Sequence, residues 1–175
     1  TEGQPINLEE YDNWLMVRQY RHALDRAVAC LAARAHSKHE IEQKLLRVGY
    51  RPCTVEMVLY KLEREHLLND ADFARQWVEA RSGRKLGRSR IAQELRRKGI
   101  DADEAEEALS AIGEDAQLAD AIALAEKAAA RAKSDEDPRK TYQRIAAMLA
   151  RRGFRWDIAK EALAQVLQAK SEAKR

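Results

Sequence analysis

Apolar residues recur along this chain in a pattern that is repeated three times. An isoleucine is followed four residues later by a leucine, then after four more by a glycine, and directly by a further apolar residue. The copies begin at Ile41, Ile91 and Ile145, so the second starts 50 residues after the first and the third another 54 residues on. Side chains four residues apart share one face of an α-helix. Each copy therefore predicts an amphipathic helix that ends at its glycine.

A second amphipathic helix is predicted after each glycine. In the first copy its apolar positions have the i, i+3, i+4, i+7 spacing of one helix face. These positions are Val55, Val58, Leu59 and Leu62, then Ala105, Ala108, Leu109 and Ile112, then Ala159, Ala162, Leu163 and Val166. A further helix precedes each pair, over roughly residues 22–35, from residue 70 onward, and over about 116–133. The repeating unit is therefore three helices.

Residues that start and stop helices stand at the predicted ends. Glycine adopts the left-handed conformation of a helix C-terminus without strain, and the apolar residue after it suits the hydrophobic contact of a Schellman motif. Ser37 and Glu40 have the spacing of a capping box, and Pro52 suits the first turn of the following helix. Asp137 before Pro138 can cap a helix of the third copy.

These elements divide the chain into three repeats with short flanking segments. We expect an N-terminal tail and leading helix over 1–21, three-helix repeats over 22–67, 68–113 and 114–169, and a basic C-terminal tail over 170–175. Strong helix formers dominate the composition, whereas residues that favour sheets are scarce. One such unit buries too little apolar surface to be stable alone, so neighbouring units must stack. The predicted fold is all-α, with three tandem three-helix repeats forming an elongated, curved helical array.

The chain shows no arrangement of residues typical of an enzyme. His36 and His39 are three residues apart, but no cysteine or carboxylate completes a metal-ligand set, so the histidines are interpreted as polar surface residues. Cys30 lies on an apolar helix face and is assigned to the core, while Cys53 has no base placed beside it. Glycine loops for phosphate and the Gly-x-Ser-x-Gly motif are absent. We expect no catalytic residue, cofactor or metal.

Composition also bears on where the protein works. No apolar run approaches the roughly 18 residues of a membrane span, and the N-terminus does not resemble a signal peptide. Two cysteines are too few for the disulfide scaffold of a secreted domain. We expect a cytoplasmic monomer that does not bind membranes.

Charge is segregated along the chain, although the net charge is only +3. Residues 81–98 hold eight basic residues and the single acid Glu94, whereas residues 99–120 hold eight acids and no base. Beyond the pair Arg90–Glu94, this separation disfavours local ion pairing and predicts a basic surface for phosphates or an acidic protein. Arg47, Arg97 and Arg151 occupy one position of the repeat, which predicts a stripe along the array.

A helix–turn–helix that reads the DNA major groove is disfavoured. That arrangement would place the last helix of the second repeat against phosphates, and its first turns carry five acids between Asp101 and Glu107. Binding along a nucleic-acid backbone or a protein groove stays open.

The second repeat resembles the most recognisable block of the RecX family. The resemblance rests on Leu68-Asn69-Asp70, Phe73-Ala74, Trp77-Val78, Arg81, Gly87, Arg90-Ile91, Glu94-Leu95 and Lys98-Gly99-Ile100, and extends from about residue 24 to 166. Asn69 replaces the usual aspartate and keeps a helix cap. The resemblance assigns structural motif positions to Asp70, Phe73, Trp77, Gly87, Ile91, Leu95 and Gly99.

The resemblance implies a regulator of DNA repair and homologous recombination. RecX-like proteins bind RecA, lie in the groove of its filament on single-stranded DNA, and lower filament extension, ATPase, strand exchange and SOS co-protease activity. By this resemblance the chain is a negative modulator of RecA. The residues expected to contact the filament or its phosphates are Arg81, Arg84, Lys85, Arg88, Arg90, Arg96, Arg97, Lys98, Arg144, Arg151 and Arg152. The residues alone leave a second function open, in which the basic face binds nucleic acid directly without RecA.

Overall fold

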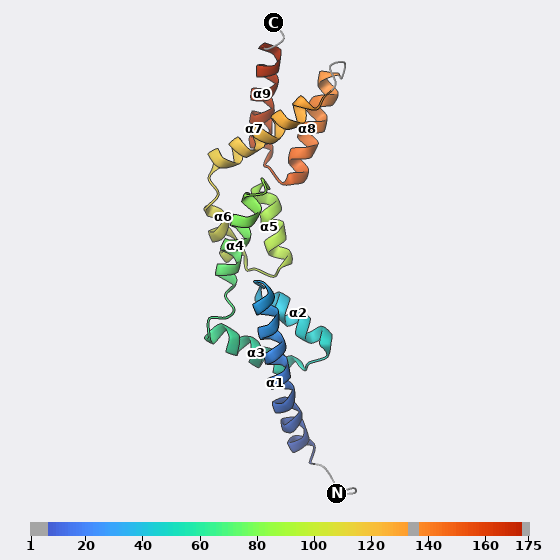
Figure 1. Cartoon of the computed structure of the whole chain (residues 1–175), viewed down its shortest axis with the longest axis vertical. Coiled ribbons are helices and arrows are strands. Elements are labelled where there is room, and N and C mark those ends of the chain that lie inside the picture. The colour runs from blue at the N-terminus through green and yellow to red at the C-terminus, as the bar shows by residue number, and fades with distance from the viewer. Residues whose placement is uncertain (1–6, 133–136, 173–175) are drawn as a thin grey trace. The chain divides into compact units, whose positions relative to one another are not determined.

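The computed structural model describes residues 7–132 and 137–172, and every regular element in these ranges is an α-helix. Figure 1 labels them α1 (Leu8–Ala33), α2 (Lys38–Val48), α3 (Pro52–Arg64), α4 (Asp70–Ser82), α5 (Arg88–Arg97), α6 (Ala102–Ser110), α7 (Glu114–Ala130), α8 (Pro138–Arg152) and α9 (Trp156–Glu172). They follow one another in three sets of three, which confirms the predicted all-α fold of tandem three-helix repeats.

The helices belong to two compact units. The first unit comprises Thr1–Phe73 and Lys98–Ile100, and the second comprises Ala74–Arg97 and Asp101–Arg175. Thus α1, α2 and α3 lie in the first unit, and α5 to α9 lie in the second.

The first helix is longer than the sequence pattern predicts. A leading helix was expected before residue 22, separate from the first helix of the repeat, but α1 runs uninterrupted from Leu8 to Ala33. Asn7 caps its start, since the Asn7 side chain accepts a hydrogen bond of 3.0 Å from the Glu9 N–H. No glycine or proline follows until Gly49, so no helix breaker separates the two expected pieces.

Two other helix ends differ slightly from expectation. Helix α7 stops at Ala130, before the expected end near residue 133, which lies outside the described residues. Helix α9 continues to Glu172 and so takes in the first part of the predicted basic tail. The rest of that tail, residues 173–175, and the N-terminal residues 1–6 also lie outside the described ranges.

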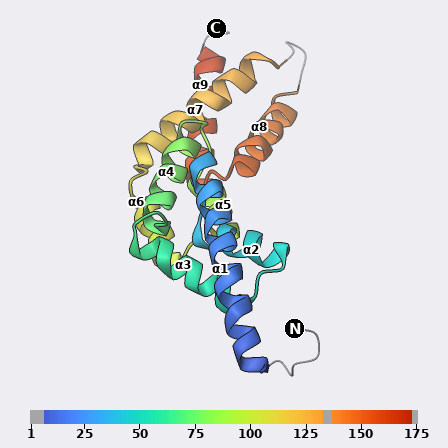
Figure 2. The ribbon, with the colours of Figure 1, turned by 60° about the horizontal axis from the view of Figure 1, so that its bottom comes forward.

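The core of the first unit is formed by one face of each of its three helices, which pack together in Figure 2. Its fully buried side chains include Ile41 and Leu45 of α2 and Val58 and Leu62 of α3. Helix α1 contributes mainly alanines and leucines, and Cys30 is half-buried against this core, as expected. Burial of each large apolar side chain contributes about 1.5–3 kcal/mol, so this shared core holds the helices together.

Helix-terminating signals in the sequence act as predicted. Gly49 has a φ of +98°, and the N–H of Tyr50 donates to the Leu45 carbonyl at 3.3 Å, as in a Schellman motif. At the start of α2, Ser37 and Glu40 form a complete capping box. Asp137 caps α8 through a hydrogen bond of 2.8 Å from the Arg139 N–H.

Within the first unit, the segment Lys98–Ile100 packs against the N-terminus of α2. The Ser37 hydroxyl donates a hydrogen bond of 2.6 Å to the Lys98 carbonyl. Gly99 has a φ of +74°, and a Cβ atom at Gly99 would overlap the His39 side chain. Glycine is therefore required at position 99 both for backbone conformation and for close approach. Beside it, the Glu40 carboxylate accepts hydrogen bonds from Lys98 Nζ at 2.8 Å and from the Arg34 guanidinium at 3.2 Å.

The second unit contains the same kind of contact. Gly153 ends α8 with a φ of +87°, and a Cβ atom there would overlap the backbone of Arg90, in the first turn of α5. Gly87 lies opposite, where a Cβ atom would overlap the backbone of Gly153. Two hydrogen bonds join the segments, from the Gly87 N–H to the Arg152 carbonyl at 2.9 Å and from the Ser89 N–H to the Gly153 carbonyl at 3.2 Å. We call this the glycine joint of the second unit.

The third set of helices packs through small side chains. Buried Ala121, Ala125 and Ala129 lie every four residues along α7, and α9 presents Ala159 and Ala162 to the same core. Figure 1 shows α7 crossing α9, with α8 packed beside them. The larger side chains of this core are Ile145 and Leu149 of α8, Phe154, and Leu163 and Val166 of α9.

The glycine joint can be tested against a glycine that makes no such contact. We expect Gly153→Ala to lower the free energy of unfolding by about 3 kcal/mol, because it adds steric overlap to a left-handed backbone. Gly49→Ala is the matched control, since Gly49 has a similar positive φ but nothing within 4 Å of its Cβ position. That control should lose only about 1 kcal/mol. Urea denaturation followed by circular dichroism measures both, and equal losses would contradict the joint.

Glu40 makes the stability of the first unit depend on pH. Burial tends to raise the pKa of Glu40, but hydrogen bonds from Arg34 and Lys98 outweigh it and lower the pKa from 4.5 to about 2. A carboxyl with a lowered folded-state pKa stabilises the protein above its unfolded pKa, and this stabilisation is lost as pH falls toward the folded value. We expect Glu40→Gln to cost roughly 2 kcal/mol at neutral pH. The deficit should shrink between pH 4.5 and about 2.

Denaturation midpoints of both proteins across that pH range provide the measurement. Glu42→Gln is the control on the same helix, because the Glu42 side chain is 42% exposed and its carboxylate lies against the ring of His39 rather than against a guanidinium or ammonium. It should change stability by less than about 0.5 kcal/mol. A Glu40→Gln deficit that does not vary with pH would refute the assignment.

Candidate partner-binding groove

A groove in the second unit brings four of the predicted partner-binding residues together. It has a volume of about 770 Å³ and is lined by Arg90 and Arg96 from α5 and by Arg151 and Arg152 from the end of α8. The glycine joint creates it, because the tight contact at Gly153 holds the end of α8 against the start of α5. Arg97, which shares its repeat position with Arg151, does not line the groove. Arg151 therefore lies beside Arg90 and Arg96 rather than beside its repeat equivalent.

Glu94 organises one wall of this groove. Its carboxylate accepts hydrogen bonds from Arg81 Nε at 2.7 Å, from Trp77 Nε1 at 3.2 Å and from Arg90 Nε at 3.3 Å. The Arg81 guanidinium also lies over the Trp77 ring, 4.0 Å from its centroid. Burial would raise the pKa of Glu94, but the Arg81 and Arg90 contacts lower it below the ordinary value. Arg81 and Arg90 are thus anchored by the protein itself, and the predicted pair Arg90–Glu94 is confirmed.

Two further basic residues pair with the acidic stretch that follows them in sequence. Lys85 Nζ lies 3.3 Å from an Asp120 carboxylate oxygen, and the Arg88 guanidinium pairs with Glu106. These partners are distant in sequence, so these segregated charges pair in the folded structure and not with neighbouring residues. Helix α6 packs on α5, which brings Glu106 beside Arg88, whereas Asp120, the partner of Lys85, lies on α7. This tertiary packing could not be read from the order of charges in the sequence.

Three more predicted residues also have partners within the protein. Lys98 belongs to the first unit, where its ammonium pairs with Glu40 and lies 5.4 Å from the centroid of the Phe73 ring. The Arg152 guanidinium donates hydrogen bonds to the carbonyls of Arg84 and Lys85 at 3.2 and 3.4 Å, and it thereby stabilises the turn before α5. Arg144 donates to the Ala128 carbonyl at 3.5 Å.

The remaining predicted residues are the available cations. Arg84, Arg96, Arg97 and Arg151 are exposed, and none has an acidic partner among the described residues. Two of them, Arg96 and Arg151, line the groove, and Arg97 adjoins Arg96 on α5. A guanidinium left without a carboxylate retains its full charge for an external phosphate or acidic side chain.

Most residues of the sequence motif serve structure. Phe73, Ile91 and Leu95 are buried in the core, and Gly87 and Gly99 allow close approach of backbones. Trp77 is half-buried beneath Arg81. Asp70 accepts a hydrogen bond of 2.7 Å from the Lys38 N–H at the start of α2, and burial raises the pKa of its carboxyl.

One histidine departs from the surface role expected of it. His36 is buried, with its Nδ1 3.0 Å from the Arg34 carbonyl and its Nε2 2.7 Å from Lys44 Nζ. Since the Lys44 ammonium donates, Nε2 accepts and Nδ1 carries the proton given to the carbonyl. Burial and the positive charges of Arg34 and Lys44 lower the pKa of His36. Its position just after the end of α1, facing α2, explains the burial.

Two kinds of site are absent from the part of the chain that the structure describes. No group of three or more His, Cys, Asp or Glu side chains there could hold a metal ion. None of the described helices combines the length and apolar character needed to cross a membrane.

Comparisons with known proteins match the three helical sets one by one. Family models for the first, second and third three-helix domains of RecX match residues 23–62, 69–109 and 115–163. The chain is similar to the regulatory protein RecX of Mycobacteroides abscessus, with 38% identity over 77% of this chain and 68% of that protein. It is also similar to the regulatory protein RecX of Prosthecochloris aestuarii, with 36% identity over 84% of this chain and 95% of that protein.

A solved structure agrees with this relationship. The crystal structure of RecX from Lactobacillus salivarius superposes with a TM-score of 0.78 and 26% identity, covering 86% of this chain and 97% of that one. The helical architecture, the motif residues and the matched domains lead to the same conclusion: the chain belongs to the RecX family of regulatory proteins.

Proposed function

We propose that this protein is a negative modulator of RecA that binds the RecA filament on single-stranded DNA through the groove between α5 and α8. Family membership and the resemblance of the second repeat support the choice of partner. The observation that carries the proposal is a set of three exposed arginines, Arg96, Arg97 and Arg151, that lie in or next to this groove. None of them has an acidic partner among the described residues.

The groove suits a macromolecular surface better than a small molecule. Its cationic side chains come from two different helices held at a fixed spacing by the glycine joint. Such a surface attracts acidic side chains or phosphates and gives its partner an orientation. Bound in the filament groove, the protein would block subunit addition, and lower ATPase, strand-exchange and SOS co-protease activity follow from the shortened filament.

The internally paired cations have a different role in this proposal. Arg81, Lys85, Arg88, Arg90, Lys98 and Arg152 contact this protein's own carboxylates or carbonyls. They hold the repeats in shape, and reversing one that pairs with a carboxylate would place two carboxylates together. Arg144 and Arg84 lie outside the groove lining and are expected to make peripheral contacts.

Charge reversal of the available arginines tests the proposal. We expect Arg96→Glu, Arg97→Glu and Arg151→Glu together to raise the concentration needed to half-inhibit RecA's DNA-dependent ATPase by about 100-fold, which corresponds to about 2.8 kcal/mol of lost contacts. The control reverses Arg21, Arg64 and Lys160, which are also exposed and lie outside the groove lining, and should inhibit like the unaltered protein. Circular dichroism checks that both variants fold. Full inhibition by the folded groove variant would overturn the proposal.

A parallel titration with bare single-stranded DNA separates the alternative function. If the groove binds nucleic acid directly, the same triple reversal abolishes DNA binding without RecA, and inhibition occurs only at concentrations that coat the DNA. A filament modulator inhibits at concentrations that leave bare DNA largely unoccupied.

A further inference from the structure

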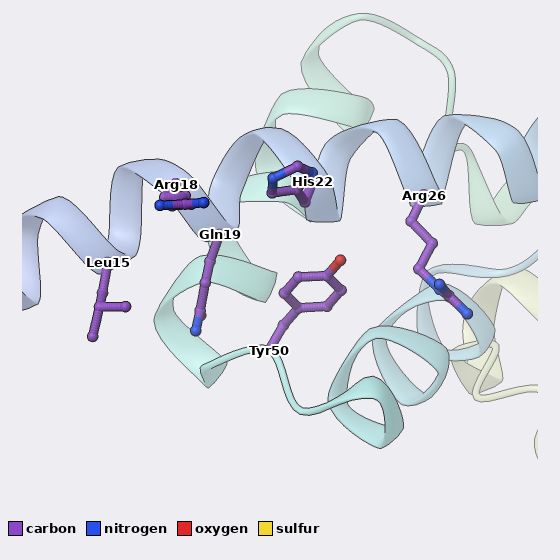
Figure 3. A pocket seen from close by; sticks show the side chains of 6 residues that line it. All are labelled: Leu15, Arg18, Gln19, His22, Arg26 and Tyr50. Carbon is purple, nitrogen blue, oxygen red and sulfur yellow. The ribbon is translucent and has the colours of Figure 1, made fainter.

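A second concave basic surface lies in the first unit, on α1. Its lining consists of Leu15, Arg18, Gln19, His22 and Arg26 of α1 together with Tyr50, and its volume is about 530 Å³. Figure 3 shows the Tyr50 ring facing α1, with Gln19 and Arg26 on either side of it. No carboxylate is among the lining residues. We call this the α1 groove.

The basic residues of the α1 groove are regularly spaced. Arg18, His22 and Arg26 are four residues apart, so they lie on one helix face and succeed one another by about 6 Å along the axis. All three are exposed, and none forms an ion pair with an acidic side chain within the described ranges. The spacing is comparable with the step between successive phosphates of an extended strand. A row of donors of this kind follows a phosphate backbone.

The opposite wall of the groove is fixed in place. The Arg51 N–H donates to Gln19 Oε1 at 3.3 Å, and Arg51 Nη1 pairs with an Asp12 carboxylate oxygen at 3.1 Å. These contacts tie the turn after α2 to α1 and neutralise Asp12. The Schellman hydrogen bond from the Tyr50 N–H to the Leu45 carbonyl sets the position of the tyrosine. The groove therefore exists before any ligand binds, which limits the entropy lost on binding.

Exposed aromatic rings continue the groove toward the start of α1. Tyr11 and Trp14 stack with centroids 6.1 Å apart and planes inclined by 20°, although their exposed fractions are 46% and 52%. The Arg18 guanidinium lies 5.1 Å from the centroid of the Trp14 ring and so joins the aromatic pair to the basic row. Unpaired nucleobases stack on exposed aromatic rings, and here such rings adjoin a row of basic side chains.

We propose that the α1 groove is a binding site for single-stranded nucleic acid. Arg18, His22 and Arg26 contact successive phosphates, and Trp14 with Tyr11 provides the platform on which a base stacks. This site shares no residue with the groove between α5 and α8, and its binding of nucleic acid does not require RecA. The ligand class follows from the combination of a basic row and exposed aromatic rings on one helix.

Fluorescence anisotropy of a labelled oligo(dT) strand, without RecA, tests the site. We expect Arg18→Ala with Arg26→Ala to raise Kd about 10-fold or more and to reduce the slope of log K against log salt by about 1.4, the loss of two phosphate contacts. Trp14→Leu should raise Kd about 5-fold or more while leaving the salt slope unchanged, because stacking releases no counterion. The salt dependence of binding therefore distinguishes the phosphate contacts from the stacking platform.

The matched control removes the same charge from other faces of the first unit. Arg21→Ala with Arg64→Ala alters one arginine of α1 outside the groove lining and one of α3. It should bind oligo(dT) nearly as the unaltered protein does. Equal weakening by both double variants would mean diffuse attraction and overturn the proposal. Loss of binding only on reversal of Arg96, Arg97 and Arg151, or equally tight binding of poly-glutamate, would overturn it as well.

A failure here is distinguishable from failure of the proposed function. Inhibition of RecA's ATPase by the Arg18→Ala, Arg26→Ala variant reports on the groove between α5 and α8, and oligo(dT) binding reports on the α1 groove. Far-UV circular dichroism and the denaturation midpoint show whether the variants keep the fold of α1.

Discussion

Close contact between a helix-ending glycine and the first turn of a helix is the constraint on which the packing inside each unit depends. Gly99 makes it with His39 in the first unit, and Gly153 makes it with Arg90 in the second. Neither contact leaves room for a Cβ atom, so the residue that ends the helix also sets how closely the next segment approaches. In the second unit this approach brings Arg151 beside Arg90 and Arg96. The groove is thus a consequence of backbone packing rather than of side-chain choice alone.

Local features were predictable because their causes are local. Capping boxes, glycine stops and the i, i+4 spacing of apolar residues involve neighbours in sequence, and α2, α3, α5 and α8 form where these signals stand. The continuity of α1 was missed because an exposed, mixed-polarity segment gives no clear period, although the absence of glycine and proline was a usable signal. Glycine was predicted for its conformation, whereas its part in the glycine joint depends on residues about 60 positions away.

Charge was the least predictable feature of the site. A basic block followed by an acidic block looks segregated in sequence, but α6 packs on α5, where Arg88 meets Glu106, and Lys85 pairs with Asp120 of α7. Segregation along a chain is therefore compatible with pairing in space whenever later helices pack beside earlier ones. Of the eleven cations proposed from sequence, only the few that find no carboxylate remain to act on a partner. The two basic surfaces also differ in their neighbours. The cations of the α1 groove adjoin the exposed aromatic rings of Tyr11 and Trp14, whereas the lining of the groove between α5 and α8 contains no aromatic residue.

The alanine face shared by α7 and α9 has a consequence for how the third repeat is positioned. Methyl groups at Ala121, Ala125 and Ala129 present a nearly smooth surface, and Ala159 and Ala162 face it with equally small groups. These small groups permit close helix contact, while the larger buried side chains Leu163 and Val166 of α9 fix where the two helices meet. The turn before α9 adds a second constraint, because the Leu149 carbonyl of α8 accepts a hydrogen bond from the Phe154 N–H. The position of α9 along its axis is therefore set by a few large side chains and one short turn, with the alanines allowing the helices to approach.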